Sequence, residues 1–303
     1  MRHALIALLA LIGAPGSAKP QDTEPFQISV DVSLVVLNPS VRDRQGRFVS
    51  DLSEPDFALR EDGVRQSIKL FRHEDVPVTV GLVIDHSGSM KPKLPEVIAA
   101  ARSFVQSSRP DDRMFVVNFN EKVKLGLPAA ISFAGSSSLL TRAISGTPAA
   151  GMTALYDAAV EAFKLFPADG PEKKVMIVVS DGGDNASTHK MPELLKIAEQ
   201  SSVLVYTIGI FDSDDPDKNP GVLNRLARAT GGEAFFPRQR DEIEAICQNI
   251  ARDIRNQYTI GYVSGNTSKP GAWRSIQLTA AAAGHGKLQV RTRSGYITGD
   301  KSR

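Results

Sequence analysis

The stretch that decides the fold is "VTVGLVIDHSGSM", residues 78–90. Its first part, residues 78–84, is a short and almost continuously apolar run, which is typical of a strand buried on both faces of a sheet. An acid and two hydroxyls, Asp85, Ser87 and Ser89, follow at alternating positions. The pattern predicts a buried strand whose carboxyl end opens into a polar site.

Strands of the same kind recur along the chain and alternate with helical patterns. Further apolar runs occupy residues 113–119, 174–180 and 202–210, and a last short strand is expected at 233–237. Helical periodicity covers residues 97–105, 153–166, 191–200, 221–229 and 241–254. Alternating strands and helices predict a largely parallel sheet that helices cover on both sides. For residues 76–255 we therefore expect an α/β fold with a doubly wound, mostly parallel sheet.

Both flanks of this domain are of β type. The N-terminal β segment, residues 22–75, alternates apolar residues between Ile28 and Val36 and has a hairpin signal at Asp62-Gly63. The C-terminal β segment, residues 256–300, has strand-like runs separated by Gly, Pro, Asn and Ser. Because the two ends of a domain often lie close together, we expect the two segments to pair into a small β-sandwich-like module.

The first 18 residues have the pattern of a secretory signal peptide. An apolar run from Ala4 to Gly13 follows the basic start and precedes small residues at Gly16 and Ala18. A membrane-spanning helix needs about 20 apolar residues, and neither this run nor any later segment provides them. We expect cleavage after Ala18, no membrane span in the mature chain, and an exported product that is periplasmic, on the cell surface or secreted.

Composition limits the partners and the means of stabilisation. The chain is 42% apolar and 23% charged, as in ordinary globular proteins. Its net charge is only +2, so there is no electrostatic case for nucleic acid or an anionic membrane as partner. Cys247 is the single cysteine, and an intramolecular disulfide is therefore excluded. An exported protein of this size must then depend on its core or on a bound metal.

Two acids and three hydroxyls are predicted to converge at the carboxyl ends of the strands, where open α/β sheets bind ligands. Asp85 follows one buried run and Asp181 follows another. Ser87 and Ser89 lie beside Asp85, and Thr153 opens the next long helix, where a hydroxyl is also a good cap. Such oxygen ligands suit a hard cation like Mg²⁺, which takes about six oxygens and keeps some waters. We predict a metal site that leaves one coordination position for a ligand carboxylate.

These residues resemble the metal-ion-dependent adhesion site of von Willebrand factor type A domains. "GMTALYDA" (151–158) and "SDGGDN" (180–185) are similar to the two later motifs of that family, and "DDRMFVVNF" (111–119) is similar to its second strand. The resemblance covers about residues 76–255, and the flanking segments resemble those of an exported bacterial subgroup. It implies Mg²⁺, or Mn²⁺ or Ca²⁺ in its place. The metal ligands that it implies are Asp85, Ser87, Ser89, Thr153 and Asp181.

Other polar residues near these motifs are expected to have lesser roles. Asp157 is interpreted as a charge at a helix N-terminus. Asp184 and Asn185 are interpreted as solvated turn residues, with a place in the ion's outer coordination shell as the alternative. His86 and His189 fall on loops near the site, but no motif pairs either of them with a nucleophile.

Together these features predict an exported, non-enzymatic binding or adhesion protein that captures an Asp or Glu of a protein partner through the metal. Two other classes stay open. One is a metal-assisted, phosphatase-like hydrolase with Ser87 as nucleophile. The other is a structural subunit of an envelope complex in which the metal is only a staple. Three features of the sequence argue against the hydrolase. The second residue after Asp85 is not another acid, there is no phosphate-binding Gly-Lys loop, and no motif places a general base near Ser87.

Overall fold

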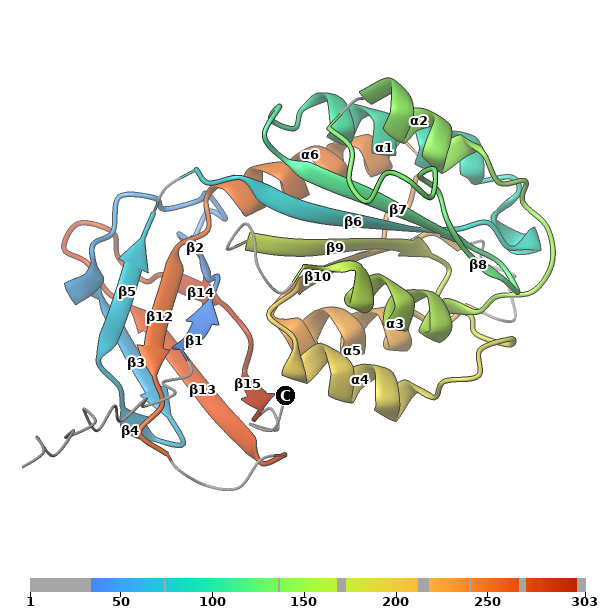
Figure 1. Cartoon of the computed structure of the whole chain (residues 1–303). Helices are drawn as coiled ribbons and strands as arrows, with labels where there is room; N and C mark the ends of the chain where they lie inside the picture. Colours follow the sequence, from blue (N-terminus) through green and yellow to red (C-terminus); the bar gives the residue numbers. More distant parts are fainter. Residues whose placement is uncertain are drawn as a thin grey trace, which may run out of the picture. The chain divides into compact units, whose positions relative to one another are not determined.

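The computed structural model describes residues 34–73, 75–135, 137–167, 173–211, 218–239, 241–266 and 271–298 (Figure 1). The predicted signal peptide lies outside these ranges. The described residues form an α/β domain and a β module, each with a hydrophobic core of its own. Within them, no helix combines the length and the apolar character needed to cross a bilayer.

The α/β domain is built on a six-stranded sheet in the order β11-β10-β9-β6-β7-β8. The strands are β6 Val78–Asp85, β7 Arg113–Phe119, β8 Val123–Leu125, β9 Lys173–Ser180, β10 Leu204–Gly209 and β11 Ala234–Phe235. Every neighbouring pair is parallel except β7 with β8. All of β6 and nearly all of β9 is buried, as expected for strands covered on both faces. The predicted doubly wound α/β fold is confirmed.

Helices cover both faces of this sheet (Figure 1). On one face lie α1 Leu94–Gln106, α2 Ser137–Ser145 and α6 Glu242–Arg255, and on the other lie α3 Leu155–Leu165, α4 Met191–Gln200 and α5 Pro220–Thr230. Each helix buries an apolar stripe, as α1 does with Val97, Ala101 and Phe104. The strand β8 and the helix α2 are not predicted from the sequence. An edge strand such as β8, with Lys124 and Leu125 exposed, lacks the apolar run that marks the inner strands.

The β module takes its strands from both flanks of the chain. The pairs are all antiparallel: β1 Leu34–Leu37 and β5 Ile68–Arg72 with β12 Thr259–Val263, β3 Phe57–Glu61 with β13 Trp273–Ala280, and β2 Ser40–Arg42 with β14 Gln289–Arg291. The short strands β4 Val64–Arg65 and β15 Gly295–Ile297 flank the β3–β13 pair. The predicted turn at Asp62-Gly63 joins β3 to β4, and both of its residues have the positive φ of a tight hairpin.

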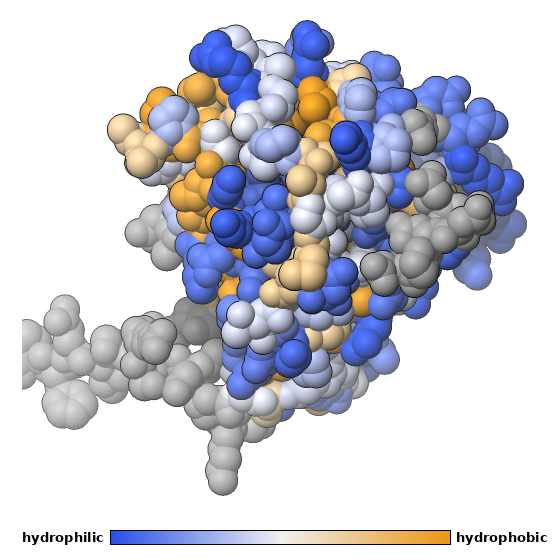
Figure 2. All heavy atoms as spheres, turned by 90° about the vertical axis from the view of Figure 1, so that its right-hand side faces the viewer, coloured by the Kyte–Doolittle hydropathy of each residue, from blue (hydrophilic) through white to orange (hydrophobic). Residues whose placement is uncertain are grey.

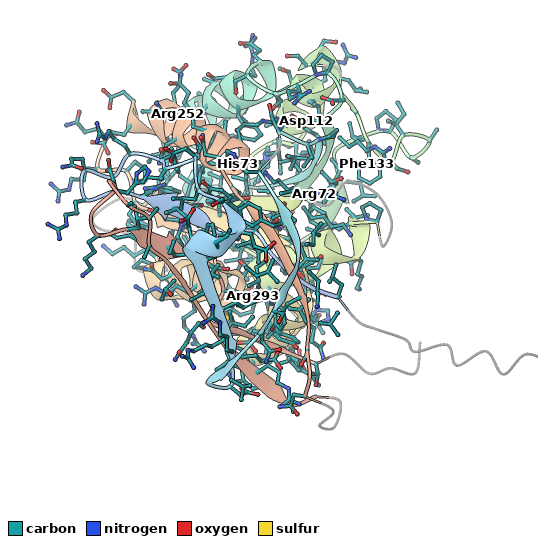
Figure 3. All side chains as sticks on the ribbon, turned by 90° about the vertical axis from the view of Figure 1, so that its left-hand side faces the viewer. Arg72, His73, Asp112, Phe133, Arg252 and Arg293 are labelled. Carbon is teal, nitrogen blue, oxygen red and sulfur yellow. The ribbon has the colours of Figure 1, made fainter. Side chains whose placement is uncertain are left out.

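Polar contacts join the β module to the α/β domain. Arg293, between β14 and β15 and labelled in Figure 3, donates from its guanidinium to the carbonyls of Glu199 at 2.7 Å and Ser201 at 2.9 Å, at the end of α4. On α6, Asp253 accepts hydrogen bonds from Ser40 in β2 and from Arg291 in β14. These contacts use residues from both ends of the chain, so the β segments help to hold the last helix of the domain.

The strand order positions the candidate site. The helix α1 connects β6 to β7 on one side of β6, and the chain returns through α3, on the opposite face, to β9 on the other side. The order of strands therefore reverses between β6 and β9, and at such a point the loops diverge and leave room for a ligand. Asp85 ends β6 and Asp181 follows β9. Figure 2 faces this edge of the domain, where hydrophilic residues cover most of the surface.

Candidate metal centre

Asp85, the last residue of β6, is fully buried, with 0% of its surface exposed. Its Oδ1 accepts a hydrogen bond from the backbone N–H of Ser87 at 2.8 Å, and its Oδ2 accepts one from Ser180 Oγ at 2.5 Å. Burial raises the pKa of Asp85 to about 6, the charge of Asp181 adds to the rise, and the hydrogen bonds oppose it. The opposing hydrogen bonds come from Ser180 and Ser87. A cation from outside would stabilise the charged form.

The loop after β6 connects Asp85 to Asp181. Ser89 Oγ donates to Asp181 Oδ2 at 2.5 Å, and Ser87 Oγ lies 3.2 Å from Ser89 Oγ. The other carboxylate oxygen of Asp181 accepts the backbone N–H of Gly183 at 3.1 Å. Four of the five predicted ligand residues thus form one continuous chain of hydrogen-bond contacts.

Thr153 reaches the same place on a third loop. The backbone N–H of Gly88, between the two serines, donates to the carbonyl of Gly151 at 3.0 Å and so brings the two loops together. Thr153 is buried, and its hydroxyl makes no hydrogen bond to any residue that the structure describes. All five predicted residues therefore lie on adjoining loops at the carboxyl edge of the sheet. Their binding of a metal stays a prediction.

The start of α3 differs from the sequence-based expectation. Thr153 does not cap this helix. The helix α3 begins at Leu155, and its N-cap residue, Ala154, makes no capping hydrogen bond through its side chain. Instead, Asp184 Oδ2 accepts the backbone N–H of Tyr156 at 2.9 Å. The interpretation of Asp184 as a solvated turn residue is therefore wrong. No local sequence pattern indicates this contact, because the cap comes from a loop 28 residues away along the chain.

Asn185 and Asp157 are also engaged between these loops. Asn185 is exposed, as expected for a turn, but its Oδ1 accepts the backbone N–H of Thr153 at 2.8 Å. Asp157 lies in the first turn of α3, as predicted. Its carboxylate also accepts the backbone N–H groups of Thr188 and His189, both at 2.9 Å. The interpretation of Asn185 as merely solvated is thus incomplete.

The two histidines near the site are not placed to activate Ser87. His86 is fully buried, and burial lowers its pKa. The ring of His189 faces Asp157, with 2.7 Å between Nδ1 and Asp157 Oδ1. The Ser87 Oγ lies 3.2 Å from Ser89 Oγ, and the Ser87 side chain also bonds to the carboxylate of Asp85.

The open side of the site has two features that the sequence did not reveal. Met152, next to Thr153, is 54% exposed. The carboxylate of Glu121 covers Gly151 so closely that a Cβ there would lie 1.7 Å from Glu121 Oε2. The turn that carries Glu121 is fixed in place by a 2.8 Å hydrogen bond from the N–H of Ala154 to the carbonyl of Asn120. An exposed apolar side chain and an acid therefore border the site.

The residues present fit a hard divalent cation. Carboxylate and hydroxyl oxygens are suitable ligands for Mg²⁺, which completes its shell with water. Among the described residues, no group of three or more His, Cys, Asp or Glu side chains is arranged for a metal ion. A metal at this edge would therefore depend on the hydroxyls of Ser87, Ser89 and Thr153 as much as on the two acids.

Comparison with known proteins gives a consistent result for the domain. The family model for the von Willebrand factor type A domain matches residues 79–249. An uncharacterized protein of Synechocystis sp. is 27% identical over 165 residues, which are 53% of this chain and only 38% of that protein. The chain thus corresponds to well under two thirds of this relative.

One of the solved structures compared with this chain supports the fold. A von Willebrand factor type A protein from Catenulispora acidiphila aligns with a TM-score of 0.53 and 16% identity, over 84% of this chain and 76% of that one. The conserved hypothetical protein BatB from Bacteroides thetaiotaomicron aligns with a TM-score of 0.46 and 17% identity, over 58% of this chain and 98% of that one. At these identities the likeness concerns the fold alone.

Proposed function

Because this chain belongs to the von Willebrand factor type A domain family, whose domains mediate contacts between proteins, we propose that it is a non-enzymatic binding protein. Its α/β domain captures an acidic group of a protein partner through a divalent cation. The observation that carries the proposal is the imbalance of charge at the carboxyl edge of the sheet. There, Asp85 and Asp181 are buried together, and hydroxyls and backbone N–H groups donate the hydrogen bonds to their carboxylates.

Mg²⁺ is the cation that fits best, with Mn²⁺ or Ca²⁺ as alternatives. The hydroxyls of Ser87, Ser89 and Thr153 would bind it directly, and Asp85 and Asp181 directly or through water. When bound, the cation supplies positive charge and a coordination position for an outside ligand. The chain itself fixes the oxygens on three joined loops and keeps the side next to Ser89 and Met152 open to solvent.

An acidic partner suits this arrangement for two reasons. A carboxylate is a hard oxygen ligand, as Mg²⁺ requires. Hydroxyls carry no charge, so a cation held by them and by acids that bind through water keeps part of its attraction for a further anion. The neutral hydroxyls are therefore as important to partner capture as the two acids.

The first experiment measures Mg²⁺ binding by calorimetry and partner capture from an envelope extract with the purified protein as bait. Ser87→Ala is the test variant, and Ser132→Ala, an exposed serine elsewhere in the domain, is the matched control. We expect the wild type and Ser132→Ala to bind Mg²⁺ and retain a partner that EDTA releases, and Ser87→Ala to do neither while its fold is intact. Equal binding by Ser87→Ala contradicts the proposal.

Export is proposed from the signal-peptide pattern of residues 1–18. Expression in a Gram-negative host and mass spectrometry of the purified product test it. We expect the mature chain to begin at Lys19 and to be recovered outside the cytoplasm. A product that keeps Met1 and remains in the cytoplasm contradicts export.

The two alternative classes make different predictions. A phosphatase-like hydrolase needs an activated Ser87, but the ring of His189 is bonded to Asp157 instead, and the hydroxyl of Ser87 lies beside that of Ser89. A screen of generic phosphoesters with Mg²⁺ tests that class, and turnover lost in Ser87→Ala would support it. If the metal were only a structural staple, a partner would stay bound to the wild type through EDTA washing.

A further inference from the structure

Two loops of the candidate metal centre hold one another through main-chain and side-chain hydrogen bonds. One loop precedes α3 and carries Thr153, and the other follows β9 and runs from Asp181 to Lys190. Asn185 Oδ1 accepts the N–H of Thr153 at 2.8 Å. In return, the carbonyl of Thr153 accepts the N–H groups of Asn185 and Ala186, both at 3.0 Å. Both main-chain polar groups of Thr153 are thus bonded to the second loop.

The same loop also caps the helix that Thr153 precedes. Asp184 Oδ2 accepts the N–H of Tyr156 at 2.9 Å, and Ser187 Oγ accepts the N–H of Asp157 at 3.1 Å. The carboxylate of Asp157 accepts two successive N–H groups of the loop in return, both at 2.9 Å. The first N–H groups of a helix have no partner within the helix, so these bonds tie the start of α3 to the loop in both directions.

From this geometry we propose that Asn185 is a positioning residue for the metal centre, an inference that rests on the function proposed above. Asn185 lies on the loop that Asp181 begins, and it holds the backbone of Thr153. One short piece of chain therefore supplies one ligand and sets the place of another. Residues that orient metal ligands in this way typically change metal affinity by about 10–100-fold when they are replaced.

The two candidate cations give this inference a specific signature. Mg²⁺ requires near-octahedral geometry at short distances, whereas Ca²⁺ accepts six to eight ligands in a flexible arrangement. A Thr153 hydroxyl that is free to move therefore weakens Mg²⁺ binding more than Ca²⁺ binding. A residue that only stabilises the fold would change both affinities alike or neither.

The test compares three variants in the full chain. Asn185→Ala removes the acceptor for the Thr153 N–H, and Asn185→Asp keeps an acceptor at the same place. Thr188→Ala is the matched control, because Thr188 is exposed on the same loop and its hydroxyl bonds to no described residue. The measurements are Mg²⁺ and Ca²⁺ affinity by calorimetry, the metal-free Tm, and hydrogen exchange of the Thr153 amide by NMR in EDTA.

We expect Asn185→Ala to lower Mg²⁺ affinity by about 10–100-fold, to lower Ca²⁺ affinity less, and to speed exchange of the Thr153 amide. Asn185→Asp should restore slow exchange, and Thr188→Ala should match the wild type throughout. Unchanged exchange in Asn185→Ala overturns the inference, as does an equal loss for both cations together with a lower metal-free Tm. If the wild type binds neither cation, the proposed function fails, while the exchange measured in EDTA still decides whether Asn185 orders Thr153.

Discussion

Buried acids in two regions of the α/β domain have opposite surroundings. At the candidate metal centre, Asp85 and Asp181 receive hydrogen bonds only from hydroxyl and N–H groups. At the seam, by which we mean the contacts of Asp253 with the β module and with β10, the acid accepts bonds from Ser40 Oγ at 2.5 Å and Tyr206 OH at 2.6 Å, and it pairs with the guanidinium of Arg291. Both regions bury their acids almost completely, and the seam pairs its acid with a guanidinium.

Under the proposed function, this difference separates two kinds of buried acid. Asp253 stabilises the fold, and Asp85 is proposed to bind a cation. At the seam, Arg291 compensates the charge of Asp253 and is itself fixed by hydrogen bonds to the Gly231 carbonyl and Ser40 Oγ, both at 2.9 Å. At the candidate metal centre, burial raises the pKa of Asp85 to about 6, and the charge of Asp181 adds to the rise. Burial therefore disfavours the charged form of Asp85, and a bound cation would favour it.

The core of the β module contains a third buried acid, Glu61. Glu61 is buried and accepts hydrogen bonds from the hydroxyls of Tyr262 at 2.5 Å, Tyr296 at 3.0 Å and Ser264, without an ion pair among the described residues. Hydroxyls alone thus suffice for one isolated acid. The candidate metal centre differs because it places a second acid, Asp181, close to the first, and the proposed cation would offset the charge of this pair.

The largest expected effect is the loss of unfolding free energy when the ion pair of the seam is removed. Asp253→Ala leaves the largely buried Arg291 with only the longer ion pair to Glu233, at 3.7 Å, among the described residues, and the loss of one member of a buried ion pair costs about 3–5 kcal/mol of unfolding free energy. Glu161→Ala is the control, because it removes only a surface pair with Lys164, worth about 0–1 kcal/mol. Urea unfolding in EDTA compares the two. Similar small losses would mean that the seam does not hold α6.

At the candidate metal centre, by contrast, a substitution is expected to raise the free energy of unfolding. Asp85→Asn keeps an acceptor for the Ser87 N–H and removes the buried charge, so it should stabilise the metal-free protein at neutral pH by about 3 kcal/mol. The same variant should lose Mg²⁺ binding. Unfolding in EDTA and calorimetry measure the two effects. A destabilised Asp85→Asn would show that Asp85 serves the fold, as Asp253 does.

The pH dependence of the metal-free protein follows from the same pKa. The pKa of Asp85 is raised from its ordinary 3.8 to about 6 on folding, so the folded chain holds this proton more tightly than the unfolded chain. The contribution of Asp85 to stability is greatest below pH 3.8, falls as the pH rises through 6, and is constant above. The stability gap between Asp85→Asn and the wild type should therefore be larger at pH 7.5 than at pH 5, by about 1.4 kcal/mol. A gap that does not change with pH contradicts the raised pKa.

The smallest effect is expected at the border of the site. Glu121 is exposed and lies against Gly151, where its charge opposes an incoming carboxylate. Glu121→Gln should strengthen metal-dependent partner binding by about 0.2–1 kcal/mol, the range of exposed charge pairs, and less so at high salt. Calorimetry in low and high salt measures this. A weaker complex would mean that Glu121 contacts a basic group of the partner instead.

The sequence predicts the parts of this molecule that local patterns determine. Buried parallel strands are continuous apolar runs, so β6 and β9 are evident, and the polar residues after them fall at one edge because the strands are parallel. The edge strand β8 has no such run and is missed. The cap of α3 by Asp184 and the contact of Glu121 with Gly151 are missed because each depends on how two separate loops meet.

The contacts of the seam are even harder to predict from the sequence than those between the loops. Ser40 and Asp253 are 213 residues apart in the sequence. Taken alone, Asp253 is typical of a polar position on an amphipathic helix. Nothing in the local pattern of either residue indicates a buried contact. Sequence patterns thus reveal the acids of the candidate metal centre more readily than the acid of the seam.

The central claim is most directly tested by thermal unfolding of the wild type and Asp85→Asn, each in excess Mg²⁺ and in EDTA. A ligand at about 100 times its Kd stabilises a protein by about 2.7 kcal/mol. We predict that Mg²⁺ raises the Tm of the wild type, that EDTA reverses the rise, and that Asp85→Asn melts at one temperature in both. Identical wild-type curves with and without Mg²⁺, or an equal shift in both proteins, would contradict a metal centre at Asp85.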